Sequence, residues 1–186
     1  MSVEATSETP GPMNADEYAA WVVGRPGRYE LRHGRVVRLQ AERNEHNRVK
    51  TRISAAFTSA LEGHPSGCTS YGDGASVRIY DDVVYEPDAT ITCGTFVADS
   101  IFASEPTVVV EVVSPSSVRK DTDVKFEGYF HVPSIHHFLV VNTQTKKIVH
   151  HRREGDGIRS GIYGLGTIRL DPPGIELDVD YVFRGL

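Results

Sequence analysis

The chain has 186 residues, 39% of them hydrophobic and 24% charged, a composition typical of a globular protein of ordinary domain size. Its formal net charge of -5 excludes a uniformly basic surface, so any contact with nucleic acid must come from a local patch. No apolar run is long enough to span a bilayer or to act as a signal sequence. The two cysteines, Cys68 and Cys93, lie far from any CxxC spacing, and together these features predict a cytoplasmic protein.

The N-terminal part of the chain predicts a tail, a short helix and a hairpin. Residues 1–12 are rich in Ser, Thr, Glu, Gly and Pro and predict a disordered tail, which leaves 13–186 as a single domain. Asn14 followed by Glu17 is a typical N-cap pattern and predicts a short helix that ends before Gly24. Residues 29–39 predict a hairpin, with Glu30 on its first strand, where a glutamate is more often a surface residue than a functional one.

The clearest helix is predicted over residues 44–62, because its apolar residues follow one stripe: Val49, Ile53, Ala56, Phe57, Ala60 and Leu61. His46 lies at the upstream end of this stripe and should point toward the element that the helix packs against. A histidine in such a place is more often a hydrogen-bonded structural residue than a functional one, so both interpretations stay open.

Further along the chain, residues 63–74 are rich in turn formers, and 76–80 predict a strand that turns at Asp81 and Asp82. The next strand is predicted from Val83 to Thr92. Pro87 lies inside it and indicates a strand start, a sheet edge or a bulge. Asp88 follows this proline directly.

The stretch 107–117 contains five valines, interrupted by Glu111, and predicts a central strand covered on both faces. Glu111 should therefore be buried on the same face as Val109 and Val113. A buried carboxylate needs a partner, which can be a metal ion, a proton, or a structural arginine or lysine.

The loop 94–106 allows the strand that carries Asp88 to pair antiparallel with the valine-rich strand. Asp88 opens its strand and Glu111 lies late in the next, so antiparallel pairing brings the two carboxylates together. Two buried carboxylates repel each other unless a cation lies between them, which makes this pair a candidate metal site.

Ser114-Pro115-Ser116-Ser117 should end the valine-rich strand, after which Asp121 or Thr122 can cap a helix that runs to about His131. Lys125 lies in the first turns of this helix, where a lysine is normally solvated. Strands are predicted at 137–142, 147–152 and 175–183. The fold class is therefore α/β or α+β, a sheet flanked by helices.

Five features together resemble a bacterial family of restriction-endonuclease-like proteins, abundant in cyanobacteria and actinobacteria, within the PD-(D/E)xK nuclease superfamily. They are Glu30 in Tyr-Glu-Leu-x-x-Gly, His46 at the start of the long helix, Pro87-Asp88, Glu111 in Val-Glu-Val-Val-Ser-Pro-Ser, and Lys125 followed by Tyr129. Each motif alone is weak, but their order is fairly specific, and the resemblance covers about Ala15 to Phe183.

The resemblance implies a restriction-endonuclease-like fold and hydrolysis of phosphodiester bonds, most often in DNA. Asp88 and Glu111 would hold Mg²⁺ or Mn²⁺, and Glu30 and His46 would line the site. The superfamily pattern puts a lysine two residues after the glutamate, where this chain has Val113, and the resemblance moves that role to Lys125. Arg119 and Lys120 are the nearest alternatives.

Three functions compete: a nuclease, a catalytically silent nuclease-like protein that binds nucleic acid or another partner, and a different metal hydrolase. A glycosidase would need a cleft lined with aromatic residues, whereas the single tryptophan, Trp21, falls in the outer helix. The sequence contains no separate recognition module. Sequence-specific cleavage would therefore require loops of the fold itself to enter a groove of the DNA, and a homodimer could present two sets of such loops.

Overall fold

The computed structural model describes residues 10–113 and 120–186, which contain four helices and twelve strands. The helices are α1 (Ala15–Val22), α2 (Asn44–Leu61), α3 (Lys120–His131) and α4 (Val179–Phe183). The strands are β1 (Tyr29–Arg32), β2 (Arg35–Arg38), β3 (Thr69–Gly72), β4 (Val77–Tyr80), β5 (Val83–Tyr85), β6 (Ala89–Thr92), β7 (Pro106–Val113), β8 (His137–Asn142), β9 (Lys147–Glu154), β10 (Gly157–Tyr163), β11 (Thr167–Leu170) and β12 (Ile175–Asp178).

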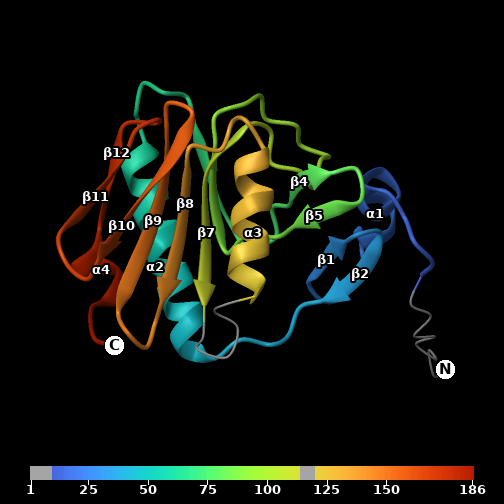
Figure 1. The fold of residues 1–186 in the computed structure, drawn as a ribbon, viewed down its shortest axis with the longest axis horizontal. Helices are drawn as coiled ribbons and strands as arrows, with labels where there is room; N and C mark the ends of the chain where they lie inside the picture. The colour runs from blue at the N-terminus through green and yellow to red at the C-terminus, as the bar shows by residue number, and fades with distance from the viewer. Residues whose placement is uncertain (1–9, 114–119) are drawn as a thin grey trace.

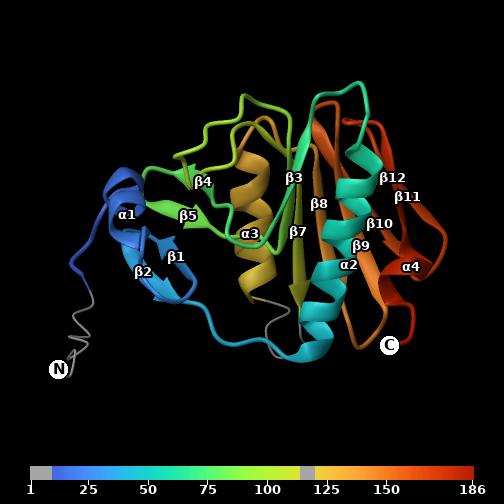
Figure 2. The ribbon, with the colours of Figure 1, turned by 180° about the vertical axis from the view of Figure 1, so that it is seen from behind.

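A six-stranded mixed sheet, in the order β10-β9-β8-β7-β6-β3, forms the centre of the molecule. Its strands pair antiparallel except β7 and β8, which are parallel and are joined through α3. Helix α3 covers the face toward the viewer in Figure 1, and α2 covers the opposite face, seen from behind in Figure 2. The valine-rich strand β7 therefore lies in the middle of the sheet with a helix on each side, as its sequence predicts.

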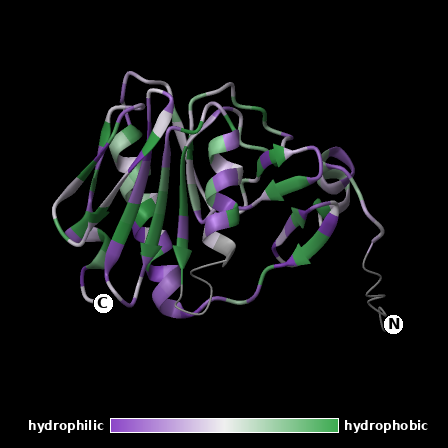
Figure 3. Cartoon of the chain, in the orientation of Figure 1, coloured by the Kyte–Doolittle hydropathy of each residue, from purple (hydrophilic) through white to green (hydrophobic). Residues whose placement is uncertain are grey.

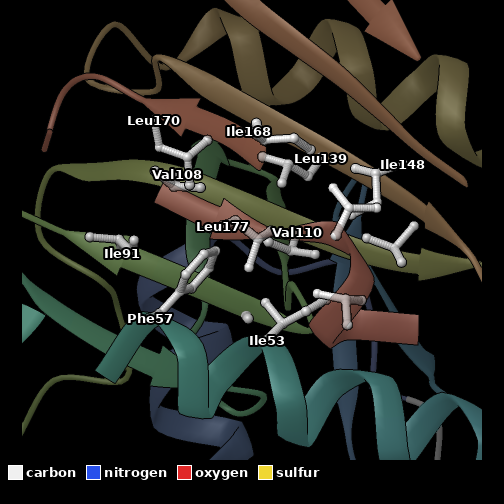
Figure 4. Close-up of a cluster of buried hydrophobic side chains, with 14 of the residues drawn as sticks. Ile53, Phe57, Ile91, Val108, Val110, Leu139, Ile148, Ile168, Leu170 and Leu177 are labelled. Atoms are coloured by element: carbon white, nitrogen blue, oxygen red, sulfur yellow. The ribbon is translucent and has the colours of Figure 1, made fainter. Parts of the chain in front are cut away.

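Alternating residues of β7 supply two separate cores. Val108 and Val110 face α2, where Ile53 and Phe57 pack against the sheet and against the small β11–β12 hairpin (Figure 4). On the other face, Val109 and Val113 pack beneath α3, against a cluster that includes Tyr129 and Phe138. Figure 3 shows β7 as mostly hydrophobic. Glu111 shares the α3 face with Val109 and Val113, as period-2 alternation predicts.

A second sheet, in the order β2-β1-β5-β4, lies with α1 to one side of the central sheet (Figure 1). Asn14 caps α1 by accepting from the backbone N–H of Glu17, and the Glu17 side chain accepts in return from the N–H of Asn14. The β1–β2 hairpin turns at His33 and Gly34, both with positive φ (49° and 72°), the backbone that a two-residue hairpin turn needs. The predicted helix cap and hairpin are both confirmed.

Other sequence predictions were wrong in detail. The strand predicted from Val83 to Thr92 is two strands in different sheets, β5 and β6, because Pro87 has no N–H to continue the ladder and the chain changes sheet there. The stretch 175–183 is strand β12 followed by the short helix α4, which Asp178 caps by accepting from the N–H of Tyr181.

Strand β3 lies in the region predicted only as turns, and β10 and β11 were not predicted. Helix α3 begins at Lys120, so Asp121 and Thr122 lie inside its first turn instead of preceding it. The predicted tail up to residue 9 and the predicted strand break at 114–117 lie outside the described residues.

A disulfide joins Cys68 to Cys93 next to the paired residues Thr69 and Thr92, and so links the start of edge strand β3 to the end of β6. A reducing compartment would break this bond, so the cytoplasmic location remains a prediction. Among the described residues, no helix is long and apolar enough to cross a membrane.

Candidate active site

A cavity of about 630 Å³ opens between the β1–β2 hairpin, the carboxyl ends of β7 and β8, and the first turns of α2 and α3. The connection 39–43, which runs from β2 to α2 past the end of β7 in Figure 1, forms one wall. Four of the five predicted site residues line this cavity: His46, Asp88, Glu111 and Lys125. The fifth, Glu30, lies behind it and contacts Lys125.

Asp88 lies where the chain passes from one sheet to the other, and two hydrogen bonds hold it in place. Its backbone N–H donates to the carbonyl of Val110 (2.9 Å), and its Oδ2 accepts from the N–H of Val112 (2.7 Å), so it brackets Glu111 on the neighbouring strand. Strand β6 begins one residue later, where Ala89 pairs with Val110, so Asp88 lies beside Glu111 at this end of the two strands. The two carboxylates are close enough for the charge of Asp88 to raise the pKa of Glu111, as expected where these two antiparallel strands meet.

Glu111 is nearly buried, with 12% of its side chain exposed. Its Oε1 accepts from Lys125 Nζ (2.8 Å) and from the Tyr129 hydroxyl (2.6 Å), whereas its Oε2 accepts no hydrogen bond from the described residues. Burial, opposed by Lys125 and reinforced by the charges of Asp88 and Glu30, raises the pKa of Glu111 to about 7. A second positive charge in the cavity would lower that pKa again.

Lys125 points inward from α3 and is only 6% exposed, unlike a typical lysine in a first helical turn. Its Nζ lies 2.8 Å from Glu111 Oε1 and 2.9 Å from Glu30 Oε1. Burial alone would lower the pKa of Lys125, but the two carboxylates more than offset it and raise the pKa, so the ammonium is charged. Tyr129 follows one helical turn later and binds the same glutamate oxygen.

Glu30 is fully buried on β1, which corrects the interpretation of it as a surface strand residue. Besides Lys125, its partners are Arg32, which donates through Nε (2.9 Å) and Nη2 (2.6 Å), and the backbone N–H of Glu86 (3.3 Å). Burial tends to raise the pKa of Glu30, but Lys125 and Arg32 outweigh it and hold that pKa below its usual range. Glu30 thus anchors Lys125 from the side opposite Glu111.

His46 is 8% exposed on the first turns of α2 and lines the cavity, as its position on the apolar stripe predicts. Its buried Nδ1 has no hydrogen-bond partner among the described residues. A buried polar nitrogen without a partner costs free energy, so the histidine is not explained as a hydrogen-bonded structural residue.

Sequence reasoning missed a charged network beside Asp88. Lys50 of α2 and Arg28, before β1, together contact four carboxylates: Glu42, Asp73, Glu86 and Asp88. Burial tends to lower the pKa of Lys50, but these carboxylates more than offset it and raise the pKa. A signal was present in the sequence, since Lys50 follows His46 by one helical turn and precedes Ile53 on the buried stripe.

The sequence and the fold of this protein both match known proteins along almost the whole chain. Residues 15–180 match the model of the Uma2 family, described as "Putative restriction endonuclease". The chain belongs to the Uma2 family. An uncharacterized protein of Synechocystis sp. is 26% identical over 178 residues, which cover 94% of this chain and 93% of that one.

Among solved structures, the chain is similar to a DUF820 putative nuclease from Anabaena variabilis, with a TM-score of 0.69 and 12% sequence identity. The match covers 92% of this chain and 98% of that one. At this identity the match shows the fold, and it confirms the restriction-endonuclease-like architecture that the sequence resemblance implies.

The donor atoms of this Uma2 site fit the divalent ion that the resemblance implies. With every group in its ordinary ionised state, Lys125 and Arg32 balance Glu30 and Glu111, whereas Lys50 and Arg28 face four carboxylates, so two negative charges of these groups remain uncompensated. No three His, Cys, Asp or Glu side chains of the described residues are spaced to enclose a metal ion. Two carboxylates are nevertheless what Mg²⁺ commonly takes, with water and substrate phosphate as its other ligands.

The superfamily's usual lysine position is occupied by Val113, which is 9% exposed and packs into the core beneath α3. Lys125 reaches the glutamate from the next helix instead. The geometric condition set by the sequence, that Lys125 must point inward, is therefore met. Arg119 lies outside the described residues, as does the side chain of Lys120.

Proposed function

We propose that this member of the Uma2 family is a Mg²⁺- or Mn²⁺-dependent endonuclease that hydrolyses phosphodiester bonds of DNA. The observation that carries the proposal is the convergence of Asp88, Glu111 and Lys125 on one cavity, from the residue before β6, from β7 and from α3. Two carboxylates and one ammonium, all largely buried, are the groups that such hydrolysis requires.

In this proposal Asp88 and Glu111 would hold the divalent ion. Asp88 Oδ1 also contacts Lys50 Nζ, and Glu111 Oε2 accepts no hydrogen bond from the described residues. The N–H of Val112 fixes the other Asp88 oxygen, and Lys125 with Tyr129 fixes the other Glu111 oxygen. Each carboxylate thus presents one oriented oxygen. The ion, when bound, polarises the phosphate and lowers the pKa of water.

Lys125 contributes charge toward the phosphate. Its ammonium is held between Glu30 and Glu111, so it is oriented before substrate arrives and needs little reorganisation during the reaction. Glu30 acts through Lys125 and is a positioning residue. His46 would line the site beside these groups, although its Nδ1 is buried and has no hydrogen-bond partner among the described residues.

The nucleic acid would approach along a basic segment. Residues 25–52 contain nine of the chain's 20 lysines and arginines but only three of its 25 acidic residues, so they carry net positive charge in an acidic chain. Arg28, Arg32 and Arg43 from this segment line the cavity. Arg28 and Arg32 are already paired with carboxylates, so Arg43 and the exposed arginines of the segment would supply the local patch that a negatively charged protein needs to bind a phosphate backbone.

The test is a cleavage assay on supercoiled plasmid, single-stranded DNA and RNA with Mn²⁺, Mg²⁺, Ca²⁺ or EDTA. We expect Mn²⁺- or Mg²⁺-dependent cleavage that disappears in Asp88→Ala. The matched control is Asp171→Ala, an exposed aspartate away from the cavity, which should cleave normally. Wild-type protein that binds DNA and Mn²⁺ but cleaves no substrate would favour the silent nuclease-like alternative. Sedimentation of the same samples tests the predicted homodimer.

A further inference from the structure

Lys50 lies in an unusual place for a lysine. It is 5% exposed, on the face of α2 that packs toward the sheet, one turn after His46. Its Nζ contacts three carboxylates: Glu42 at 2.7 and 2.9 Å, Asp73 at 2.8 Å and Asp88 at 2.9 Å. The ammonium is thus enclosed by acidic groups in the way that a bound cation would be.

The three carboxylates come from separate parts of the fold. Glu42 lies in the connection between β2 and α2, Asp73 follows β3, and Asp88 precedes β6. Without a cation among them, three carboxylates gathered in this way would repel one another strongly. Arg28 compensates part of this charge, with Nη1 at 2.7 Å from Glu42 and 3.3 Å from Asp73. The cluster is therefore built around the lysine and arginine charges.

Asp88 belongs to both neighbouring clusters. Its Oδ1 contacts Lys50 Nζ, and its other bonds, to Val110 and Val112, flank Glu111, the other proposed metal ligand. In two-metal nucleases and phosphatases the ions lie about 3.5–4 Å apart, close enough to share a carboxylate. In this chain, a lysine ammonium contacts Asp88 Oδ1, the oxygen that is also available to the metal ion, while Oδ2 accepts from Val112.

We propose that Lys50 takes the place of a second metal ion. This chain binds one divalent cation, at Asp88 and Glu111, whereas the cluster of Glu42, Asp73 and Asp88 would admit a second one if the lysine were absent. The inference rests on the proposed metal site and adds its stoichiometry and the positioning role of Lys50. The carboxylate oxygens stand 2.7–2.9 Å from Nζ, an ammonium distance, whereas Mg²⁺ needs 2.0–2.1 Å. Among the described residues, no three His, Cys, Asp or Glu side chains are spaced to enclose a metal ion.

Removing the ammonium should open the second site. In Lys50→Met the side chain keeps its length and apolar stem, and the three carboxylates are left with Arg28 as their nearest cation. Adding Asp73→Asn to Lys50→Met withdraws one carboxylate and should close the new site again. Lys147→Met, which removes an exposed lysine at the start of β9, is the matched control.

The experiment counts Mn²⁺ ions bound to the full-length chain by electron paramagnetic resonance of free Mn²⁺ and by isothermal titration calorimetry, without substrate. We expect one ion for wild type and for Lys147→Met, two for Lys50→Met, and one for the double variant. Two ions on wild type, or one ion of unchanged affinity on Lys50→Met, would overturn the inference.

The outcome also separates this inference from the proposed function. If wild type binds no Mn²⁺ but Lys50→Met binds one, the proposed metal site fails and the role of Lys50 stands. Should Lys50→Met fold poorly, the rise in its melting temperature with Mn²⁺ replaces the count. A rise at least twice that of wild type supports the inference, and an equal or smaller rise refutes it.

Discussion

Replacing Lys125 with methionine should destabilise the protein even in the absence of metal and substrate. The variant keeps the length of the side chain but removes both ion pairs, 2.9 Å to Glu30 and 2.8 Å to Glu111. Removing one partner of a buried ion pair typically costs about 3–5 kcal/mol, because the other charge stays buried without compensation. Arg32 remains beside Glu30, so we expect a loss near the lower end, about 3 kcal/mol. In a chain of this size that corresponds to a fall in melting temperature of roughly 6–12 °C.

The assay is urea unfolding of wild type, Lys125→Met, Glu30→Gln and the double variant. In the double variant Glu30 is neutral, so it no longer adds the cost of a buried charge without Lys125, although Glu111 still lacks its partner. The loss should therefore be smaller than the sum of the two single losses by at least about 1 kcal/mol. A Lys125→Met variant as stable as wild type, or losses that simply add, would refute the argument that Glu30 and Lys125 form one buried unit.

Three further predictions concern metal binding, the histidine pair and the disulfide. Excess Mn²⁺ at about 100 times its Kd should stabilise wild type by about 2.7 kcal/mol in thermal unfolding, and Asp88→Asn should lose this gain; an equal gain in both would remove Asp88 from the ligand set. His137 Nδ1 lies 2.9 Å from His150 Nε2, and burial lowers the pKa of each histidine to about 4. Because the unfolded chain takes up protons near pH 6.5 and the folded one does not, the free energy of unfolding should be full above that pH and fall as the pH drops toward 4. His150→Gln should flatten that profile, and an unchanged profile would contradict the assignment. Cys68→Ser removes the disulfide to Cys93, 25 positions away, and should lower the free energy of unfolding in urea by about 3 kcal/mol. Equal stability of wild type with and without reductant would contradict this prediction.

Local signals in the sequence were sufficient for several elements. The capping pair Asn14 and Glu17, the two-residue turn at His33 and Gly34, and the apolar stripe of α2 each act over a few residues, so the pattern alone predicts the structure. Glu111 is a similar case, because alternation within β7 alone predicts that its side chain lies on the face of the sheet that α3 covers.

The change of sheet at Pro87 could not be predicted, because the residues before and after it are equally typical of strands. Only tertiary packing decides that Val84 pairs with β1, whereas Ala89 pairs with β7. The short helix α4 was missed for a similar reason, since alternating apolar residues in so short a segment suit a strand or a helix.

The resemblance supplied the order of the site residues, and the structure supplies their partners. The cluster around Lys50 draws on Glu42, Asp73 and Asp88, which are separated by 31 and 15 positions and lie in three different connections. No periodicity links such positions, so their meeting follows only from the fold. Glu30 is a comparable case, because its burial depends on β5 and α3 closing over β1.

The central claim is that Glu111 and Lys125 act together in metal-dependent cleavage, and single-turnover cleavage of labelled DNA with Mn²⁺ tests it most directly. We expect Glu111→Gln and Lys125→Met each to slow cleavage by about 10²-fold or more, with the folded fraction checked by circular dichroism. The double variant should be no slower than the slower single variant, because the residues work as one unit. Mn²⁺-dependent cleavage by Glu111→Gln at the wild-type rate would contradict the account.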